Sequence, residues 1–129
     1  MNRLKPDKRF CGKTVHEMRL ADAPFDMIKS GKKTVEVRLN DEKRRQICVG
    51  DIIIYRRKSG IGDTCAVNVV DLRQYKNFFE LFSAELLAAT GCENMIAEQA
   101  VQSMYQYYTA EQESGFGVLA IQIKLIDEQ

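Results

Sequence analysis

Three charged residues lie close together in the stretch "SGKKTVEVR", residues 30–38: Lys33, Glu36 and Arg38. The alternation of polar and apolar residues predicts a strand in which Thr34, Glu36 and Arg38 share one face, spaced about 6.5 Å apart at two-residue steps. An ammonium, a carboxylate and a guanidinium around one pocket would suit a polar ligand. The competing interpretation is an ion pair on the solvent-facing side of a one-sided sheet, where polar residues alternate in the same way.

The residues on both sides of this stretch predict the elements that position it. The sequence "TVHEMRL", residues 14–20, alternates as a half-buried strand does. A short helix should follow, with Asp22 as its N-cap and Gly31 at its C-terminal end, since glycine tolerates positive φ. Lys33 then lies at the junction between this helix and the strand of residues 34–39, where the backbone can turn its amine toward the polar face.

Further strands are predicted downstream. Residues 49–55, "VGDIIIY", turn at a glycine and enter a β-branched strand. The glycine-rich residues 58–63 form a hairpin loop, and residues 64–75 supply the returning strand. The apolar residues 117–126 end the folded part as a strand, and their near-continuous apolar character favours a central position in the sheet.

Helical spacing replaces alternation before the last of these strands. One helix is predicted from Phe78 to Gly91 and a second from about Met95 to Tyr107. The apolar face of the first helix consists of Phe78, Leu81, Phe82, Leu86 and Leu87. Strands at both ends with helices between them indicate an α+β class without regular βαβ alternation. A small mixed or antiparallel β-barrel flanked by helices accommodates these elements, although periodicity alone does not choose it over an open sheet.

The composition is that of one soluble globular module. A chain of 129 residues fits a single domain, predicted over residues 14–129 and preceded by a basic arm at residues 1–13. No apolar stretch reaches the length needed to cross a bilayer, so no membrane partner is expected. The basic start lacks the apolar run of a secretory signal, which favours a cytoplasmic location.

The charges are nearly balanced, with a formal net charge of +1 at pH 7. This value argues against a strongly polybasic nucleic-acid binder, because counterion release needs clustered positive charge, but it allows a local patch. Basic residues do form three clusters: Lys5, Lys8, Arg9 and Lys13; Lys43, Arg44 and Arg45; and Arg56, Arg57 and Lys58. Each cluster taken alone is more typical of a solvated loop.

Cysteine and histidine usage gives no sign of a metal site or a cofactor. The four cysteines, at positions 11, 48, 65 and 92, include no C-x-x-C pair, so neither a zinc cluster nor a disulfide framework is predicted. Reduced, structural thiols are expected. His16 is the single histidine, and its place in the strand of residues 14–20 favours a core or edge role over catalysis.

Three motifs occur in a recognisable order. In "FDMIKSGKKTVEVRL" the residues Gly31, Lys33, Glu36 and Arg38 read G-x-K-x-x-E-x-R, and "VGDIIIY" follows. The later stretch "MYQYYTAEQESGFGVLAI" places tyrosines before a G-V-L-A-I strand. Together the motifs resemble the ASCH domain, named for activating-signal-cointegrator homology and related to the PUA RNA-binding barrels. The resemblance covers about residues 15–126.

The resemblance implies a PUA-like β-barrel with a cleft between the barrel and its helices. The G-x-K-x-x-E-x-R residues would line this cleft, whose expected ligand is RNA, a nucleotide or a nucleoside. There Lys33 can contact phosphate, and Arg38 can make a forked contact to phosphate or a base edge. Glu36 can orient Arg38 or accept a hydrogen bond from an exocyclic amine.

Tyrosines at the end of the second predicted helix offer rings for base stacking. Tyr107 and Tyr108 are the candidates, because readers of single-stranded RNA stack bases on such rings. Packing of the helix on the barrel is the alternative for both residues, and it is the favoured interpretation for Tyr105.

The same resemblance raises an enzymatic alternative. Some bacterial ASCH-like proteins of this size are amidohydrolases on N4-acetylcytidine, in which a lysine, a threonine three positions later and a downstream glutamate take part in catalysis. Lys33 matches the lysine, but Glu36 replaces the threonine and so removes the hydroxyl nucleophile. Thr34 could stand in as nucleophile, or Glu36 could activate water as a general base. The downstream glutamate could be one of three residues: Glu93, Glu111 or Glu113.

A protein-interaction domain, as in the cointegrator that gives the family its name, is a third class. The four motif residues specify a polar pocket rather than a particular base, sugar or protein partner. The sequence therefore leaves the ligand and the oligomeric state open.

Overall fold

Five strands of the part of the chain that the structure describes form one mixed sheet with the order β1-β3-β4-β5-β2. The computed structural model describes residues 13–60 and 62–126, so most of the predicted basic arm lies outside the described residues. The strands are β1 Val15–Leu20, β2 Val35–Leu39, β3 Ile52–Arg57, β4 Thr64–Tyr75 and β5 Val118–Leu125. The helices in this part of the chain are α1 Asp22–Lys29, α2 Glu42–Arg45, α3 Phe78–Ala84, α4 Ala97–Met104 and α5 Ala110–Phe116.

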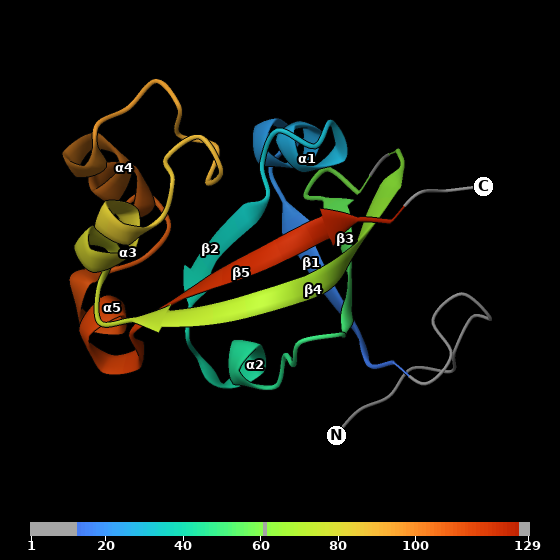
Figure 1. Cartoon of the computed structure of the whole chain (residues 1–129), viewed down its shortest axis with the longest axis horizontal. Coiled ribbons are helices and arrows are strands. Elements are labelled where there is room, and N and C mark those ends of the chain that lie inside the picture. Colours follow the sequence, from blue (N-terminus) through green and yellow to red (C-terminus); the bar gives the residue numbers. More distant parts are fainter. Residues whose placement is uncertain (1–12, 61, 127–129) are drawn as a thin grey trace.

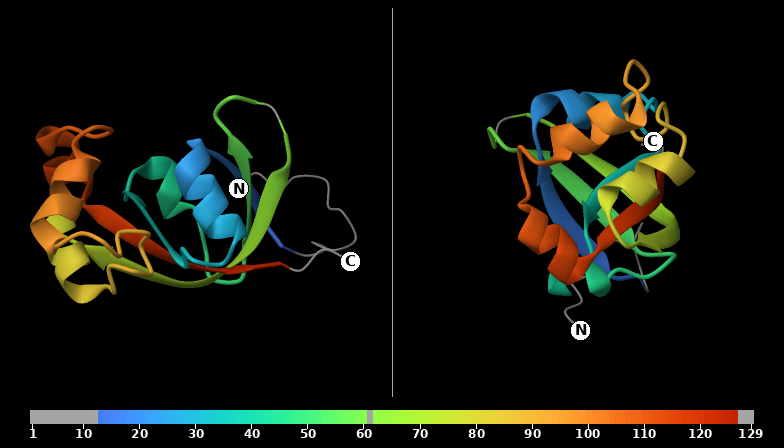
Figure 2. Two further views of the ribbon diagram at one scale, coloured as in Figure 1. Left: turned by 90° about the horizontal axis from the view of Figure 1, so that it is seen from above. Right: turned by 90° about the vertical axis from the view of Figure 1, so that its left-hand side faces the viewer.

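The sheet curls into a half-barrel. β1 pairs with β3 in parallel, whereas the other three pairings are antiparallel. β4 and β5 run as a long ribbon across the molecule, and α3, α4 and α5 gather at one of its ends (Figure 1). Figure 2 shows the curvature of the sheet, with α1 on its concave side. The predicted α+β class and the barrel-like sheet with flanking helices are confirmed.

Two apolar clusters cover the two faces of β5. Leu119, Ile121 and Ile123 pack with Phe25 and Ile28 of α1 inside the half-barrel. The alternate residues of β5, Val118 and Ala120, pack with Val35 and Val37 of β2 and with apolar residues of α3 and α4. Burial on both faces explains the continuous apolar run of β5. The strand pairs with β4 on one side and with the edge strand β2 on the other, so it is an interior strand of the sheet, although β4 and not β5 is the central one.

The helix that precedes the charged stretch forms largely as predicted. Its apolar residues Phe25 and Ile28 are buried, and Gly31 has a φ of +83°, the left-handed conformation that ends many helices. The predicted N-cap is wrong by one residue. Ala21 occupies that position without a side-chain cap, and Asp22 is the first helical residue, where a carboxylate still interacts favourably with the helix dipole.

The two longer helices predicted between residues 78 and 107 are wrong in extent. α3 ends at Ala84, because Glu85 adopts an extended conformation and its carboxylate accepts hydrogen bonds from Arg73 and Tyr75 of β4. Leu86 is 77% exposed and so does not extend the apolar face. α4 covers only residues 97–104, and the short helices α2 and α5 were not predicted. No helix within the described ranges is long and apolar enough to cross a membrane.

Candidate functional site

A cleft of about 530 Å³ lies between the half-barrel and the helices. Its walls come from the β1–α1 junction, from β2, from the segment between α3 and α4, and from the end of α4 with the residues after it. All five residues that the sequence predicts to bind a ligand line it: Lys33, Glu36, Arg38, Tyr107 and Tyr108. The structure therefore brings together two groups that are about 70 positions apart in the sequence.

The charged residues of β2 form a buried cluster on one side of this cleft. The Glu36 carboxylate lies between two cations, with Oε1 at 2.8 Å from Lys33 Nζ and Oε2 at 3.1 Å from Arg38 Nε. The Glu36 side chain is only 3% exposed, and those of Lys33 and Arg38 are 11% and 13% exposed. The cluster is thus not a pair on a solvent-facing strand. We call these three residues the floor of the cleft.

The electrostatics of the floor favour the charged forms of Glu36 and Arg38. Burial alone would raise the pKa of Glu36, but the charges of Lys33 and Arg38 outweigh it and lower that pKa below the ordinary value of 4.5. Burial opposes the charge on Arg38 in the same way, and the neighbouring Glu36 raises the pKa of Arg38 above its ordinary value. Burial and, to a smaller extent, the negative charge of Glu36 raise the pKa of the Tyr55 hydroxyl well above its ordinary value, so this buried hydroxyl stays neutral.

Arg38 has a second contact that joins the two ends of the sheet. Its Nη2 donates a hydrogen bond of 3.1 Å to the main-chain carbonyl oxygen of Arg19 in β1, while its Nε contacts Glu36. β1 and β2 are the outermost strands in the sheet order. The planar, forked guanidinium presents separate N–H groups to the two acceptors. Arg38 therefore contributes a positive charge to the floor and also connects the two outermost strands across the opening of the half-barrel.

The segment between α3 and α4 packs against the start of β2 and covers Lys33. The Lys33 main-chain N–H donates to the Met27 carbonyl, and the Ala89 carbonyl accepts from the next two main-chain N–H groups. Gly91 has a φ of +86°, and a Cβ added there would lie 3.3 Å from Lys33 Cδ and from the Met27 thioether. Glycine at this position thus permits a close approach of the segment to the Lys33 side chain.

The opposite wall carries the tyrosines. Tyr108 is half-buried and stacks on Phe78, with ring centroids 5.9 Å apart and planes inclined by 22°. Tyr107 is 60% exposed and meets Tyr108 edge-on at 6.4 Å. Tyr105 is outside the set of cleft-lining residues, and its hydroxyl donates to Glu113. The packing interpretation thus suits Tyr105, whereas the rings of Tyr107 and Tyr108 are both accessible from the cleft.

The structure does not bring the other proposed catalytic groups to the cleft. Glu93 is exposed and Thr34 is exposed, and neither residue lines it. Glu113 is buried on another side of the helices, where its carboxylate accepts hydrogen bonds from the Phe78 main-chain N–H and from Tyr105. The burial of Glu113 is therefore explained by its hydrogen bonds within the helical part of the molecule.

Sequence reasoning missed several residues that line the cleft. Arg19 and Lys58 are exposed cations at its edge, and Met27 and Met104 are apolar wall residues. Arg19 belongs to the alternating stretch of residues 14–20, and Lys58 to a basic cluster typical of a solvated loop. A basic residue directly after a strand was the available signal for Lys58, but only the tertiary arrangement shows which basic residues reach the cleft.

The curled α+β half-barrel with flanking helices is a PUA-like fold. The family model of the ASCH domain matches residues 18–127. The chain belongs to the ASCH domain family, as the motifs predicted.

Several solved structures resemble this chain. A crystal structure of hypothetical protein PH0355 has 38% sequence identity to this chain and a TM-score of 0.78, and the match covers 87% of this chain and 99% of PH0355. The solution NMR structure of protein PF0455 from Pyrococcus furiosus has 34% identity and a TM-score of 0.71, covering 88% and 99%. The ASCH protein from Zymomonas mobilis has 20% identity and a TM-score of 0.55, covering 89% and 68%, so it supports the fold alone. A search of curated proteins found no match.

Proposed function

We propose that this protein binds RNA or a nucleotide in the cleft between its half-barrel and its helices. The observation that carries the proposal is the buried, charged floor of Lys33, Glu36 and Arg38, which faces the same cavity as the rings of Tyr107 and Tyr108. Family membership supports it, because ASCH domains are generally RNA-binding, PUA-like modules. Stacking surfaces beside a polar floor are what recognition of an unpaired base requires.

Two residues of the floor and one tyrosine have distinct parts in this proposal. Lys33 retains donors beyond the one that contacts Glu36, and these can reach a ligand oxygen. The Glu36 carboxylate has spare lone pairs and can accept from an exocyclic amine of a base. The Tyr108 ring, supported from behind by Phe78, provides a rigid stacking surface at low entropic cost.

A binding titration tests the proposal. Purified protein is titrated with a panel of fluorescently labelled single-stranded and structured RNAs, with Lys33→Ala as the test variant. We expect the dissociation constant to rise by about tenfold or more, because one charge-assisted hydrogen bond is lost from a buried site. Lys43→Ala removes the same charge from the exposed surface of α2 and serves as the control. Absence of salt-sensitive binding up to high micromolar concentration would refute the proposal.

Hydrolysis of a modified nucleoside such as N4-acetylcytidine has less support from the geometry. Both carboxylate oxygens of Glu36 contact cations and its pKa is lowered, which makes it a weak general base. Thr34 and Glu93 do not line the cleft. Incubation of the protein with N4-acetylcytidine, followed by chromatography, tests this alternative, and turnover would establish it.

A further inference from the structure

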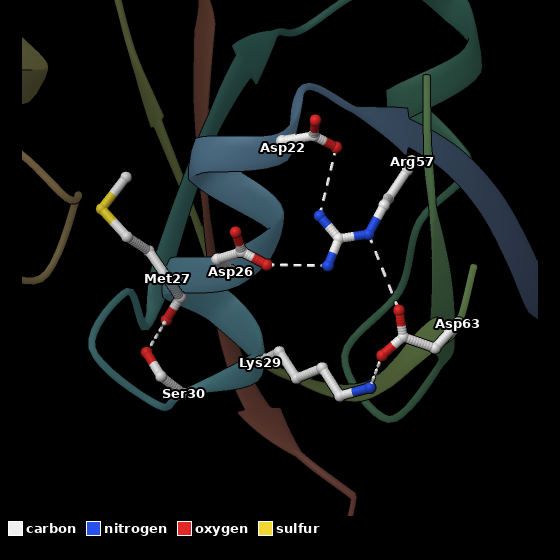
Figure 3. A network of polar contacts seen from close by, with 7 residues as sticks. All are labelled: Asp22, Asp26, Met27, Lys29, Ser30, Arg57 and Asp63. Atoms are coloured by element: carbon white, nitrogen blue, oxygen red, sulfur yellow. Dashed lines mark hydrogen bonds and ion pairs between the residues drawn. The ribbon is translucent and has the colours of Figure 1, made fainter. Parts of the chain in front are cut away.

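Basic residues at the ends of β1 and β3 differ in whether a carboxylate neutralises their charge. Arg56 contacts Glu17 at 2.7 Å, and both side chains are about half exposed. Arg57 lies over the Phe25 ring and contacts three aspartates from α1 and the hairpin loop (Figure 3). Those aspartates are Asp22, Asp26 and Asp63. The positive charges of Arg56 and Arg57 are therefore balanced locally.

Arg19 and Lys58 are not balanced in this way. Both are exposed and line the cleft, and neither forms an ion pair with any residue in ranges 13–60 and 62–126. Arg19 lies opposite Arg56 in the β1–β3 register, and the Lys58 main-chain N–H donates to the Leu20 carbonyl. The two cations thus project from adjacent strand ends. With Tyr107, which is also exposed and lines the cleft, we call them the rim.

Lys58 contacts the ring of Tyr107 at the edge of the cleft. Its Nζ lies 5.6 Å from the centroid of the Tyr107 ring, within the range of a cation–π contact. This contact links the residue after β3 to the segment after α4, and both residues line the cleft. It leaves the ammonium donors of Lys58 without a hydrogen-bonding partner among the described residues. A ligand anion at the rim would supply that partner.

Floor and rim therefore differ in the ligand group that suits them. On the floor, Lys33 and Arg38 share the Glu36 carboxylate, so donors and an acceptor alternate over a short distance. Such a surface matches the edge of a nucleobase, which also alternates donors and acceptors. At the rim, Arg19 and Lys58 have no carboxylate partner among residues 13–60 and 62–126, and two such cations match a dianionic or polyanionic group.

We propose that Arg19 and Lys58 form a phosphate subsite at the rim, so that the cleft takes a nucleoside phosphate in preference to a free nucleoside. This inference rests on the proposed function and refines it. The base lies on the floor and against Tyr108, and the phosphate lies between the rim cations. Lys33 then contacts the base or the sugar rather than the phosphate.

The test compares ligands that differ only in the phosphate. Binding of the four ribonucleosides and of their 5′- and 3′-monophosphates is measured by calorimetry at two salt concentrations, with a single-stranded RNA as the polymer. We expect at least one monophosphate to bind about tenfold more tightly than its nucleoside, with a difference that shrinks as salt rises. For the RNA, removal of each rim cation should reduce the slope of log K against log salt by roughly 0.7.

Variants assign this preference to the rim. In the double variant Arg19→Ala/Lys58→Ala the preference for the monophosphate should vanish while nucleoside binding stays within about twofold of the original protein, because the base contacts the floor. Lys58→Gln provides a milder change that keeps the length of the side chain. Arg56→Ala is the matched control, since it removes one exposed cation that has its own carboxylate partner on a neighbouring strand.

Three results would count against this inference in distinguishable ways. Equal binding of nucleosides and monophosphates would overturn the phosphate subsite and leave the proposed function intact. A preference that survives in the double variant but disappears in Lys33→Ala would show that the phosphate binds at the floor, and it would also overturn the subsite at the rim. Absence of binding for every nucleoside, monophosphate and RNA would refute the proposed function itself. Tighter binding of RNA than of any monophosphate would identify the polymer as the source of the phosphate.

Discussion

At the scale of single residues, Glu36 is the most constrained side chain of the cleft. A carboxylate that is 3% exposed loses most of its hydration, and this loss is costly unless opposite charges and hydrogen bonds replace the water. Lys33 and Arg38 supply both, one to each carboxylate oxygen. The main-chain N–H of Val37 lies 3.3 Å from Oε1 and adds a weaker contact. The three charged residues therefore depend on one another, and removal of one leaves the others poorly compensated.

Substitution of this carboxylate should destabilise the fold. In Glu36→Gln, Lys33 and Arg38 stay buried without their counter-charge, so we expect the free energy of unfolding to fall by about 3 kcal/mol. Urea denaturation followed by circular dichroism measures the change. Glu17→Gln is the control, because Glu17 is 47% exposed and its pair with Arg56 should contribute less than about 1 kcal/mol. Similar losses in both variants would show that the buried charges of the floor add no more stability than an exposed ion pair.

The same carboxylate predicts a dependence of stability on pH. The pKa of Glu36 is lower in the folded chain than the ordinary value of 4.5, so above that value the folded state gains from the charged carboxylate. As the pH falls through the folded pKa this contribution is lost, because the carboxylate must accept a proton. The difference in unfolding free energy between the original protein and Glu36→Gln should therefore shrink below about pH 4.5. A difference that is constant from pH 7 to pH 3 would contradict this expectation.

At the scale of elements, buried carboxylates connect helices to each other and to the sheet. Glu85 ends α3 and contacts Arg73 and Tyr75 of β4, so the chain leaves the helix where the sheet supplies partners. Glu113 of α5 accepts from the first main-chain N–H of α3, at Phe78, and from Tyr105 after α4. These contacts determine where the segment that covers Lys33 begins and where the tyrosine wall lies. The cleft is therefore positioned by residues that do not line it.

Loss of the Glu113 contacts should loosen the helices. In Glu113→Ala the buried Phe78 N–H and the Tyr105 hydroxyl lose their acceptor, so we expect a loss of unfolding free energy of about 2 kcal/mol or more. Chemical denaturation measures it. Glu111→Ala, at an exposed position of the same helix, should change stability by no more than about 0.5 kcal/mol. Equal effects of the two variants would show that the Glu113 contacts add nothing specific.

At the scale of the whole molecule, one side chain spans the opening of the half-barrel. β1 and β2 are at opposite ends of the sheet order, and Arg38 connects them through the Arg19 carbonyl. Because Arg38 also contacts Glu36, the floor of the cleft and the curvature of the sheet are coupled. A ligand that contacts the floor thus acts at the place where the two ends of the sheet meet.

Replacement of the guanidinium should therefore loosen an edge of the sheet. In Arg38→Lys the charge stays but one amine cannot reproduce both contacts, so we expect amides of β1 to exchange roughly tenfold faster, as loss of one charged hydrogen bond implies. Hydrogen exchange followed by NMR measures this, with amides of β4 as the internal reference. Arg45→Lys is the control, since Arg45 Nε also donates to a main-chain carbonyl, that of Asn40. Unchanged exchange in β1 would show that the bridge does not stabilise the edge.

Local patterns were sufficient to predict most of the strands. The alternation of β2, the glycine-rich hairpin between β3 and β4 and the apolar run of β5 all occur where they were predicted. These signals are local, because side-chain period and turn chemistry depend on residues that are neighbours in sequence. The helices between residues 78 and 116 were predicted less well, because distant partners such as Arg73 and the Phe78 N–H decide where they end and begin.

The sequence by itself determined the family, the α+β class and the set of polar residues that share one face of β2, since each depends on residue type and spacing. The tertiary structure alone decided that this face is buried rather than solvated, because α1, the segment after α3 and the end of α4 cover it from distant parts of the chain. It also decided which basic residues keep an unbalanced charge at the cleft. Ion pairing depends on proximity in space, and Arg56, Arg57 and Lys58 are consecutive in sequence yet have different partners.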